Sequence, residues 1–314
     1  MPIKMYFCRV NGFFMAFIKA FLEYLKYEKK YSEHTIKSYK TDLKDLKDFT
    51  EDTFKTGIEK LHYNQIRTFI VYLSQQGLSN RTINRKLSGL KTFYKFLVTT
   101  QVIKSSPLAK HKTLKTSKKV TIPFSEKEIS KVLEYFEQYN TSDFSFLRDK
   151  MIISLLYSTG IRREELIQLK VNDVNLLQNT IKVLGKRNKE RIIPLIKKVK
   201  EELEIYLLKR KEIDTTNDYL FITNKGKKIY GTFVYRLINY YFSSVTTKVK
   251  KSPHIMRHAF ATHLIDRGAE INAVKELLGH ASLASTQVYV NSNLKKIKEM
   301  YNQAHPRSYK KKDL

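Results

Sequence analysis

The sequence predicts a mainly α-helical protein with two domains: a small helical N-terminal domain, and a larger, mostly helical domain that carries a small antiparallel β-sheet. Three observations predict this fold class. Apolar residues recur at helical spacing through most of the chain, a basic stretch without that periodicity divides it, and one pair of β-branched runs flanks a short polar turn. A chain of 314 residues is also long enough for two domains.

The first domain is expected over residues 16–108. Its apolar side chains, such as Phe17, Phe21 and Leu25, are spaced to lie on one helix face. Ser32 is a favourable N-cap for the second pattern, and GLSN marks the turn before the fourth. Four amphipathic helices are therefore expected, over residues 16–30, 34–49, 63–76 and 81–100. Residues 1–15 form an extension, and Met15 is an alternative start of the natural protein.

A basic linker is expected over residues 109–122. Prolines lie near both ends of the surrounding segment, and five lysines fall between Lys110 and Lys119. Because the segment has no apolar periodicity, it is more typical of a linker than of a regular element. A surface loop inside one domain is the alternative.

The second domain is expected over residues 123–306, followed by a basic tail over 307–314. Ser125 and Glu128 fit a capping box at its first helix, and Gly160 fits the end of a strongly apolar second helix. Two β-branched runs within 179–195 predict a hairpin. Further helices are expected over residues 197–211, 231–245, 254–268, 271–279 and 282–290.

The charge of the chain predicts binding to a polyanion. Lys and Arg total 59 against 30 Asp and Glu, a formal net charge of +29. Thirteen Lys or Arg and no acidic residue lie between Lys60 and Ser125, which favours nucleic acid over an anionic membrane surface. The residues expected to contact DNA lie in the first domain and the linker: Arg81, Arg85, Lys86, Lys91, Lys112, Lys115, Lys118 and Lys119.

The location expected for the chain is the cytoplasm. No apolar run approaches the roughly 18 to 20 residues of a membrane span, so membrane insertion is not expected. The single cysteine, Cys8, excludes an internal disulfide and is compatible with a reducing compartment.

The segment SPHIMRHAFATH, residues 252–263, concentrates three of the eight histidines. His254 and His258 have the helical spacing of two zinc ligands, but the glutamate of an HExxH motif is missing and Arg257 would repel a cation. No metal is therefore expected. For His258 and His263 a structural role in helix packing is favoured, with His258 facing inward.

The same segment also fits phosphoryl-transfer chemistry. That chemistry needs cations on the non-bridging oxygens, a nucleophile and a proton donor for the leaving oxygen. The chain supplies such groups in one order: Arg162, Lys186, His254, Arg257, His280 and Tyr289. Glu164 and Glu165 need no catalytic role, because acidic residues favour a helix N-terminus. Tyr240 and Tyr241 lie on an apolar helix and are expected in the core.

In this order of motifs the sequence resembles the tyrosine recombinase (integrase) family, specifically its bacterial Xer type. The resemblance rests on STGIRREELIQL, VLGKRNKERIIPL, SPHIMRHAFATHLIDRGAEINAVKELLGHASLASTQVYV and KEMYNQAHP. In the first domain, SEHTIKSYKTDL and SNRTINRKLSGLKTFYKFL resemble the family's SAM-like core-binding domain. Together the segments span roughly residues 16–306. The resemblance implies the DNA breaking-rejoining fold for the second domain.

The resemblance implies a role for each residue of that order. Tyr289 is expected to attack a DNA phosphate and form a 3′-phosphotyrosine. Arg162 and Arg257 are expected to bind the non-bridging oxygens, and Lys186 to protonate the leaving 5′ oxygen. His254 would assist as acid or base, and His280 would orient the phosphate. Since the covalent link preserves the phosphodiester energy, no metal, ATP or other cofactor is expected.

The resemblance also implies how the protein works as a whole. Two domains would grip duplex DNA from opposite faces, and a homo- or hetero-tetramer would join two sites, with a C-terminal helix over roughly residues 293–303 docked on a neighbour. Resolution of chromosome dimers at a Xer-type site, regulated by an FtsK-type translocase at the nucleoid, is the expected role. VNSN after Tyr289 departs from the usual Xer pattern. A mobile-element integrase, a topoisomerase-like relaxing enzyme and a non-catalytic DNA-binding relative are the alternatives.

Overall fold

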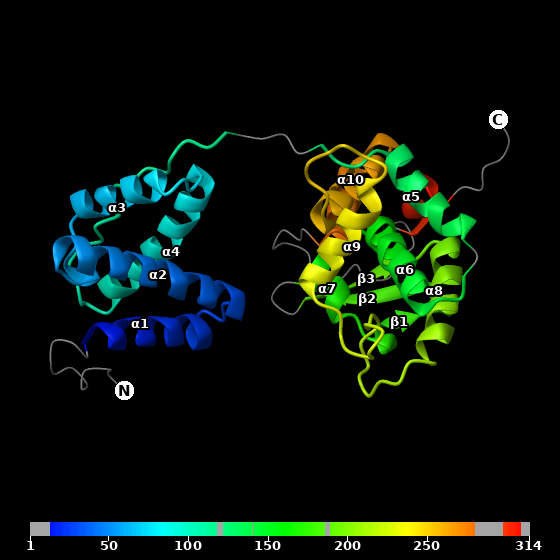
Figure 1. The fold of residues 1–314 in the computed structure, drawn as a ribbon, viewed down its shortest axis with the longest axis horizontal. Helices are drawn as coiled ribbons and strands as arrows, with labels where there is room; N and C mark the ends of the chain where they lie inside the picture. Colours follow the sequence, from blue (N-terminus) through cyan, green and yellow to red (C-terminus); the bar gives the residue numbers. More distant parts are fainter. Residues whose placement is uncertain (1–12, 118–121, 140, 186–188, 280–297, 309–314) are drawn as a thin grey trace. The chain divides into compact units, whose positions relative to one another are not determined.

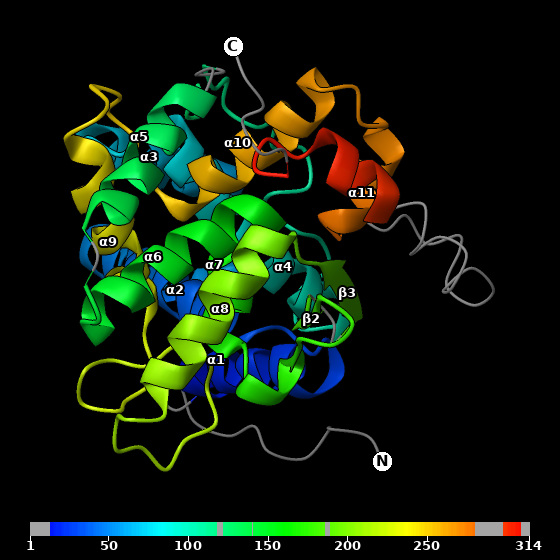
Figure 2. The ribbon, with the colours of Figure 1, turned by 90° about the vertical axis from the view of Figure 1, so that its right-hand side faces the viewer.

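The structure is a computed structural model that describes residues 13–117, 122–139, 141–185, 189–279 and 298–308. It confirms a mainly α-helical protein with one small antiparallel sheet. The chain divides into two compact units, Met1–Lys119 and Val120–Leu314, which are drawn in Figures 1 and 2. Each unit has its own hydrophobic core. No helix in the described ranges is long and apolar enough to cross a membrane.

The N-terminal unit contains the four expected helices. Ser32 and Ser79 cap the second and fourth, each accepting a hydrogen bond from the backbone three residues on. The apolar faces meet in a core that includes the fully buried Phe21, Phe69 and Phe93. The helices are α1 (Phe13–Glu23), continued by a π-helical turn (Tyr24–Glu28), α2 (Glu33–Phe54), α3 (Tyr63–Gln75) and α4 (Asn80–Thr99), with a 3-10 turn at Ile58–Lys60.

The basic segment after α4 begins as part of the N-terminal unit. His111 is buried, and the Asn84 side chain exchanges two hydrogen bonds with the backbone of Leu114, at 2.8 and 2.9 Å. Asn80 also donates to the carbonyl of Lys115 at 2.8 Å. Side chains of α4 therefore satisfy part of the backbone in the first half of the segment expected as a linker, residues 109–122.

The larger unit is organised around α6 (Phe144–Thr159), whose last nine residues are all buried. Helices α5 (Glu126–Gln138), α8 (Lys197–Arg210), α9 (Gly231–Ser243) and α10 (Pro253–Asp266) pack against it (Figure 1). The expected capping box is present, since Ser125 and Glu128 exchange hydrogen bonds at the start of α5. Two shorter helices also belong to this unit, α7 (Arg163–Gln168) and α11 (Ile271–Leu277).

The sheet has three antiparallel strands in the order β1-β2-β3. The expected hairpin forms β2 (Thr180–Leu184) and β3 (Glu190–Pro194), with Lys182 opposite Ile192. The period-2 pattern places Ile181, Val183 and Ile193 in the core. The third strand, β1 (Val174–Asn175), was not expected, because two residues are too few to show any alternation.

Residues 298–304 are helical and pack on the unit that they belong to. Tyr301 is fully buried and donates a hydrogen bond to the carbonyl of Ser158. His305 is also fully buried, against the rings of Tyr157 and Phe260. The described part of the expected 293–303 helix thus packs on its own chain through Tyr301. The helix expected over 282–290 lies outside the described residues.

Candidate phosphate-binding and catalytic site

Arg257 on α10 ties together the ends of two other helices. Its guanidinium donates to the carbonyl of Gly160, just after α6, and to that of Leu278, just after α11, each at 2.6 Å. These are carbonyls that have no partner within their helices. Burial, together with the positive charge of Arg162, lowers the pKa of Arg257 to about 10, so Arg257 remains charged at neutral pH.

Gly160 has to be a glycine for this arrangement to form. It ends α6 in the left-handed region, at φ +59°, and a Cβ there would lie 2.3 Å from the ring of Phe260. The sharp turn at Gly160 places Arg162 two residues later at the start of α7. The side chain of Arg162 is 24% exposed, which leaves its guanidinium accessible from solvent.

A buried carboxylate, Glu165, lies between Arg162 and another arginine. Glu165 accepts from the backbone and the guanidinium of Arg162, at 2.8 and 2.7 Å. It also accepts two hydrogen bonds from Arg191 on β3, at 2.9 and 2.7 Å. Burial opposes the ionisation of Glu165, but the hydrogen bonds from Arg191 and Arg162 outweigh it and lower the pKa of Glu165 to about 2.

Together these residues form an arginine cluster: Arg162, Arg191 and Arg257 around Glu165. Three positive charges and one negative charge leave two positive charges in excess. His254 is exposed one turn before Arg257, in the first turn of α10. Such an excess of guanidinium charge, partly exposed at a helix N-terminus, is suited to binding the oxygens of a phosphate.

The structure brings part of the expected site together. Arg162 and Arg257 lie in the arginine cluster, and His254 lies on the helix that carries Arg257. Lys186, His280 and Tyr289 lie outside the described residues. Two described neighbours of these residues border the cluster: a Cβ on Gly185 would lie 3.5 Å from Arg191, and one on Gly279 would lie 3.1 Å from it.

Glu165 and Arg191 are the site residues that sequence reasoning missed. Glu165 was expected only to favour a helix N-terminus, and it does stand in the first turn of α7. Its contact with Arg191 joins residues 26 positions apart, so no local pattern reveals it. The only local sign was the period-2 pattern of the hairpin strand. It places Arg191 on the same face as the buried Ile193 and Ile192 on the opposite face.

The other polar residues of the histidine segment have different environments from each other. His263 is buried and hydrogen-bonded to Tyr157 at 3.0 Å, as a structural histidine would be, and burial lowers its pKa. His258 is exposed, so the expectation that it faces inward is wrong; α10 turns that side to solvent. Within the described ranges, no group of three or more His, Cys, Asp or Glu is arranged to hold a metal ion.

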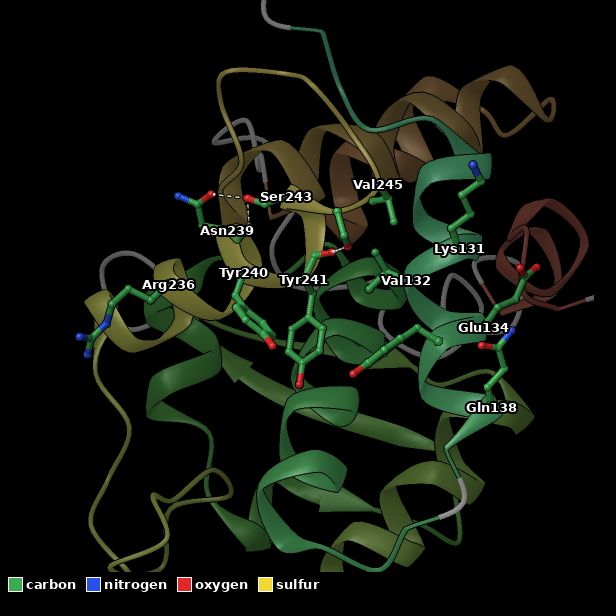
Figure 3. A pocket seen from close by; sticks show the side chains of 12 residues that line it. Lys131, Val132, Glu134, Gln138, Arg236, Asn239, Tyr240, Tyr241, Ser243 and Val245 are labelled. Atoms are coloured by element: carbon green, nitrogen blue, oxygen red, sulfur yellow. Dashed lines mark hydrogen bonds between the residues drawn. The ribbon is translucent and has the colours of Figure 1, made fainter.

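Tyr240 and Tyr241 of α9 line a groove between α5 and α9 (Figure 3). Tyr240 is 73% exposed, so its expected place in the core is wrong. Tyr241 is half-buried and donates to Asp149 at 3.4 Å. The helix is apolar on its buried face only, and Tyr240 lies off that face.

The basic residues expected to bind DNA in the N-terminal unit differ in their environments. Arg81, Lys112 and Lys115 are exposed, whereas Lys118 and Lys119 lie outside the described residues. Lys91 is half-buried and donates to the carbonyl of His111 at 3.0 Å. The remaining two, Arg85 and Lys86, are in ion pairs.

Lys86 differs from the expected surface cation because it is buried. It pairs with Asp42 at 3.1 Å and with Asp45 at 2.5 Å, both from α2. Arg85 makes two parallel hydrogen bonds to the same buried Asp42, at 2.9 and 2.8 Å. The segment between Lys60 and Ser125 contains no acidic residue, but two of its cations are therefore still paired with aspartates of α2.

Comparisons with known proteins agree on one family. The Phage integrase family matches residues 125–296, and the family "Phage integrase, N-terminal SAM-like domain" matches residues 18–101. The tyrosine recombinase XerC of Bacillus subtilis is 34% identical, over 94% of this chain and 98% of that protein. XerC of Leptospira interrogans is 39% identical, over 93% and 94%. In fold, the chain is similar to the XerH site-specific recombinase bound to palindromic difH substrate, with a TM-score of 0.68 and 22% identity over 90% and 83% of the two chains.

Proposed function

Since the chain belongs to the phage integrase family and is a tyrosine recombinase, we propose that it cuts and rejoins duplex DNA at a specific Xer-type site and so resolves chromosome dimers. The observation that supports this most directly is the arginine cluster. Arg257 binds the carbonyl two residues before Arg162, so two cations with a net excess of charge share one partly exposed location.

The proposed reaction uses residues in complementary roles. The oxygen of Tyr289 attacks the phosphorus, the bond from phosphorus to the 5′ oxygen breaks, and Lys186 gives that oxygen a proton. A 3′-phosphotyrosine and a free 5′-hydroxyl result. Reversal with the 5′-hydroxyl of another strand joins new partners, and no cofactor is consumed.

Arg162 and Arg257 would bind the non-bridging oxygens during this step. Their charge favours the additional negative charge of the transition state, an effect worth about 100-fold to 1000-fold in rate for a single donor. The ordinary pKa of a tyrosine is about 10, so nearby positive charge also favours the phenolate. His254 would assist as acid or base, and His280 would orient the phosphate.

The remaining parts of the proposal concern partners. The XerH structure with its difH substrate supports duplex DNA as a partner. Resemblance to the Xer type supports a homo- or hetero-tetramer on two sites, activation by an FtsK-type translocase, and a place at the nucleoid in the cytoplasm. The resemblance also supports docking of a C-terminal helix, roughly residues 293–303, on a neighbour, and Asn302 and Gln303 are exposed on the described part of it.

Covalent trapping on DNA tests the proposed reaction. Purified protein is incubated with nicked, fragmented DNA from the source cell, and adducts are separated on a denaturing gel and sequenced. Wild type should give a shifted band whose DNA shares one site, and Tyr289→Phe should give none because it lacks the nucleophilic oxygen.

Tyr240→Phe is the matched control, because it removes the same hydroxyl from an exposed tyrosine outside the arginine cluster. It should form adducts like wild type. An adduct that persists in Tyr289→Phe, or no adduct with any protein, would contradict the proposal.

A further inference from the structure

Arg191, the second residue of β3, contacts two other elements of the larger unit. It holds both oxygens of Glu165 at the start of α7, and its Nε donates to the carbonyl of Leu277 at the end of α11, at 3.0 Å. We propose that Arg191 is a positioning residue for DNA cleavage, which keeps the charge of Arg162 available to the scissile phosphate. This inference rests on the proposed function.

The carboxylate of Glu165 is shared between two arginines. Oε1 accepts from the guanidinium of Arg162 and from Arg191; Oε2 accepts from the backbone of Arg162 and from Arg191. Four donors therefore occupy the two oxygens, which is near the capacity of a carboxylate. Because Arg191 supplies two of the four, the negative charge of Glu165 neutralises Arg162 only in part.

Loss of Arg191 would leave Glu165 with Arg162 as its one remaining arginine partner among the described contacts. Glu165 is 5% exposed, so water would not readily replace the two lost hydrogen bonds. The buried carboxylate would then pair with Arg162 alone, which draws the guanidinium inward and cancels its charge. A phosphate at the site would meet a weaker and displaced cation.

The contact with α11 fixes the opposite side of the cluster. Arg191 binds the carbonyl of Leu277 and Arg257 binds that of Leu278, so two arginines hold consecutive carbonyls. Gly279 follows at φ +69°, and a Cβ there would lie 3.1 Å from Nη1 of Arg191. The backbone thus passes directly over the Arg191 guanidinium.

A lysine could not replace Arg191 in these contacts. Two parallel hydrogen bonds to Glu165 and a third to Leu277 need the planar, forked guanidinium, whereas an ammonium is a compact charge with no such plane. The side chain of Arg191 is also only 14% exposed, so any substitution lowers stability to some degree. The test must therefore separate positioning from stability.

The experiment compares cleavage of two substrates that carry the site recovered by trapping. One has a normal scissile phosphodiester, and the other has a methylphosphonate, in which a methyl group replaces one charged non-bridging oxygen. If Arg191 acts by keeping positive charge available to the phosphate, its substitution should slow cleavage less on the methylphosphonate, because that substrate lacks the negative charge of one non-bridging oxygen. The rate of covalent adduct formation is measured for each protein on each substrate.

Arg191→Met and Arg191→Lys should each slow adduct formation on the phosphodiester by about 100-fold, the lower end of the loss seen when one oxyanion donor is removed. On the methylphosphonate their deficit relative to wild type should shrink to about threefold or less. Arg162→Ala should show the same contraction between substrates, because Arg191 acts through Arg162.

Arg148→Met is the matched control for stability. Arg148 is 5% exposed and paired with Asp149 at the end of α6 opposite to Gly160. Its loss should lower the melting temperature comparably, without any difference between the two substrates.

The outcomes separate this inference from the proposed function. If wild type forms no adduct, both fail. If wild type forms the adduct but the Arg191 variants lose the same factor on both substrates, or if Arg191→Lys retains the full rate, positioning by the forked guanidinium is overturned while the proposed function stands.

Discussion

Gly160 is a single residue on which the geometry of the arginine cluster depends. Its carbonyl accepts a hydrogen bond from Arg257, and its left-handed backbone turns the chain toward Arg162. A side chain at this position would meet Phe260, which is 1% exposed and has no room to move. The left-handed backbone of one residue, Gly160, thus determines the position of the charged side chain of Arg162.

Gly160→Ala should therefore lower the free energy of unfolding by about 3 kcal/mol or more, through left-handed strain and overpacking together. Gly268→Ala is the control, since Gly268 has φ +85° with nothing within 4 Å of a Cβ. It should lose only the strain, about 1 to 2 kcal/mol. Urea denaturation measures both, and equal losses would exclude a role for the Phe260 contact.

At the scale of elements, the segment after residue 298 packs on α6 and α10 through buried polar residues. His305 accepts a hydrogen bond from the backbone of Arg307 at 3.1 Å, and Arg307 pairs with Glu202 at 2.8 Å. Burial, together with the positive charge of Arg307, lowers the pKa of His305 to about 3. The docking of this segment is therefore linked to pH.

Acid should weaken this docking. The unfolded state takes up a proton on His305 below about pH 6.5, while the folded state does so only near pH 3. The contribution of neutral His305 to the free energy of unfolding is thus fully present above pH 6.5. It is lost as pH falls toward 3, by up to about 1.4 kcal/mol per pH unit.

His305→Met should reduce the loss of stability between pH 6.5 and pH 4, as measured by urea denaturation across that range. Asn302→Ala, at an exposed position on the helix just before His305, should keep the wild-type pH dependence. If the free energy of unfolding of His305→Met fell with pH as steeply as that of wild type, His305 would not be the group whose protonation weakens the fold.

At the scale of the whole molecule, the net charge of +29 is divided between free cations and cations already paired. Arg81, Lys112 and Lys115 are exposed, whereas Lys86 is buried between two aspartates. Only the free cations can displace counterions from DNA, so they should determine how binding depends on salt.

Replacing Arg81, Lys112 or Lys115 with Ala should lower the slope of log K against log salt by about one for each phosphate contact removed. Lys86→Met should leave the slope unchanged, because its charge is already satisfied by Asp42 and Asp45. Binding to labelled duplex DNA over a range of salt concentrations measures this. A lower slope in Lys86→Met would contradict the assignment.

The features that the sequence by itself determined are those with local signals. Helical periodicity, the caps at Ser32 and Ser125, the glycine that ends α6 and the hairpin all depend on residues within a few positions of one another. The motif order also identified Arg162 and Arg257 as candidates, because arginine in that pattern is typical of phosphate chemistry.

Only the tertiary structure decided which charges are free and which side chains are buried. Asp42 reaches Lys86 from another helix, Glu165 reaches Arg191 across 26 residues, and His305 enters a core formed by α6 and α10. The physical reason is that burial and charge pairing depend on contacts between segments far apart in the chain. Periodicity assigns a residue to a helix face, but the partner that meets that face comes from elsewhere in the fold.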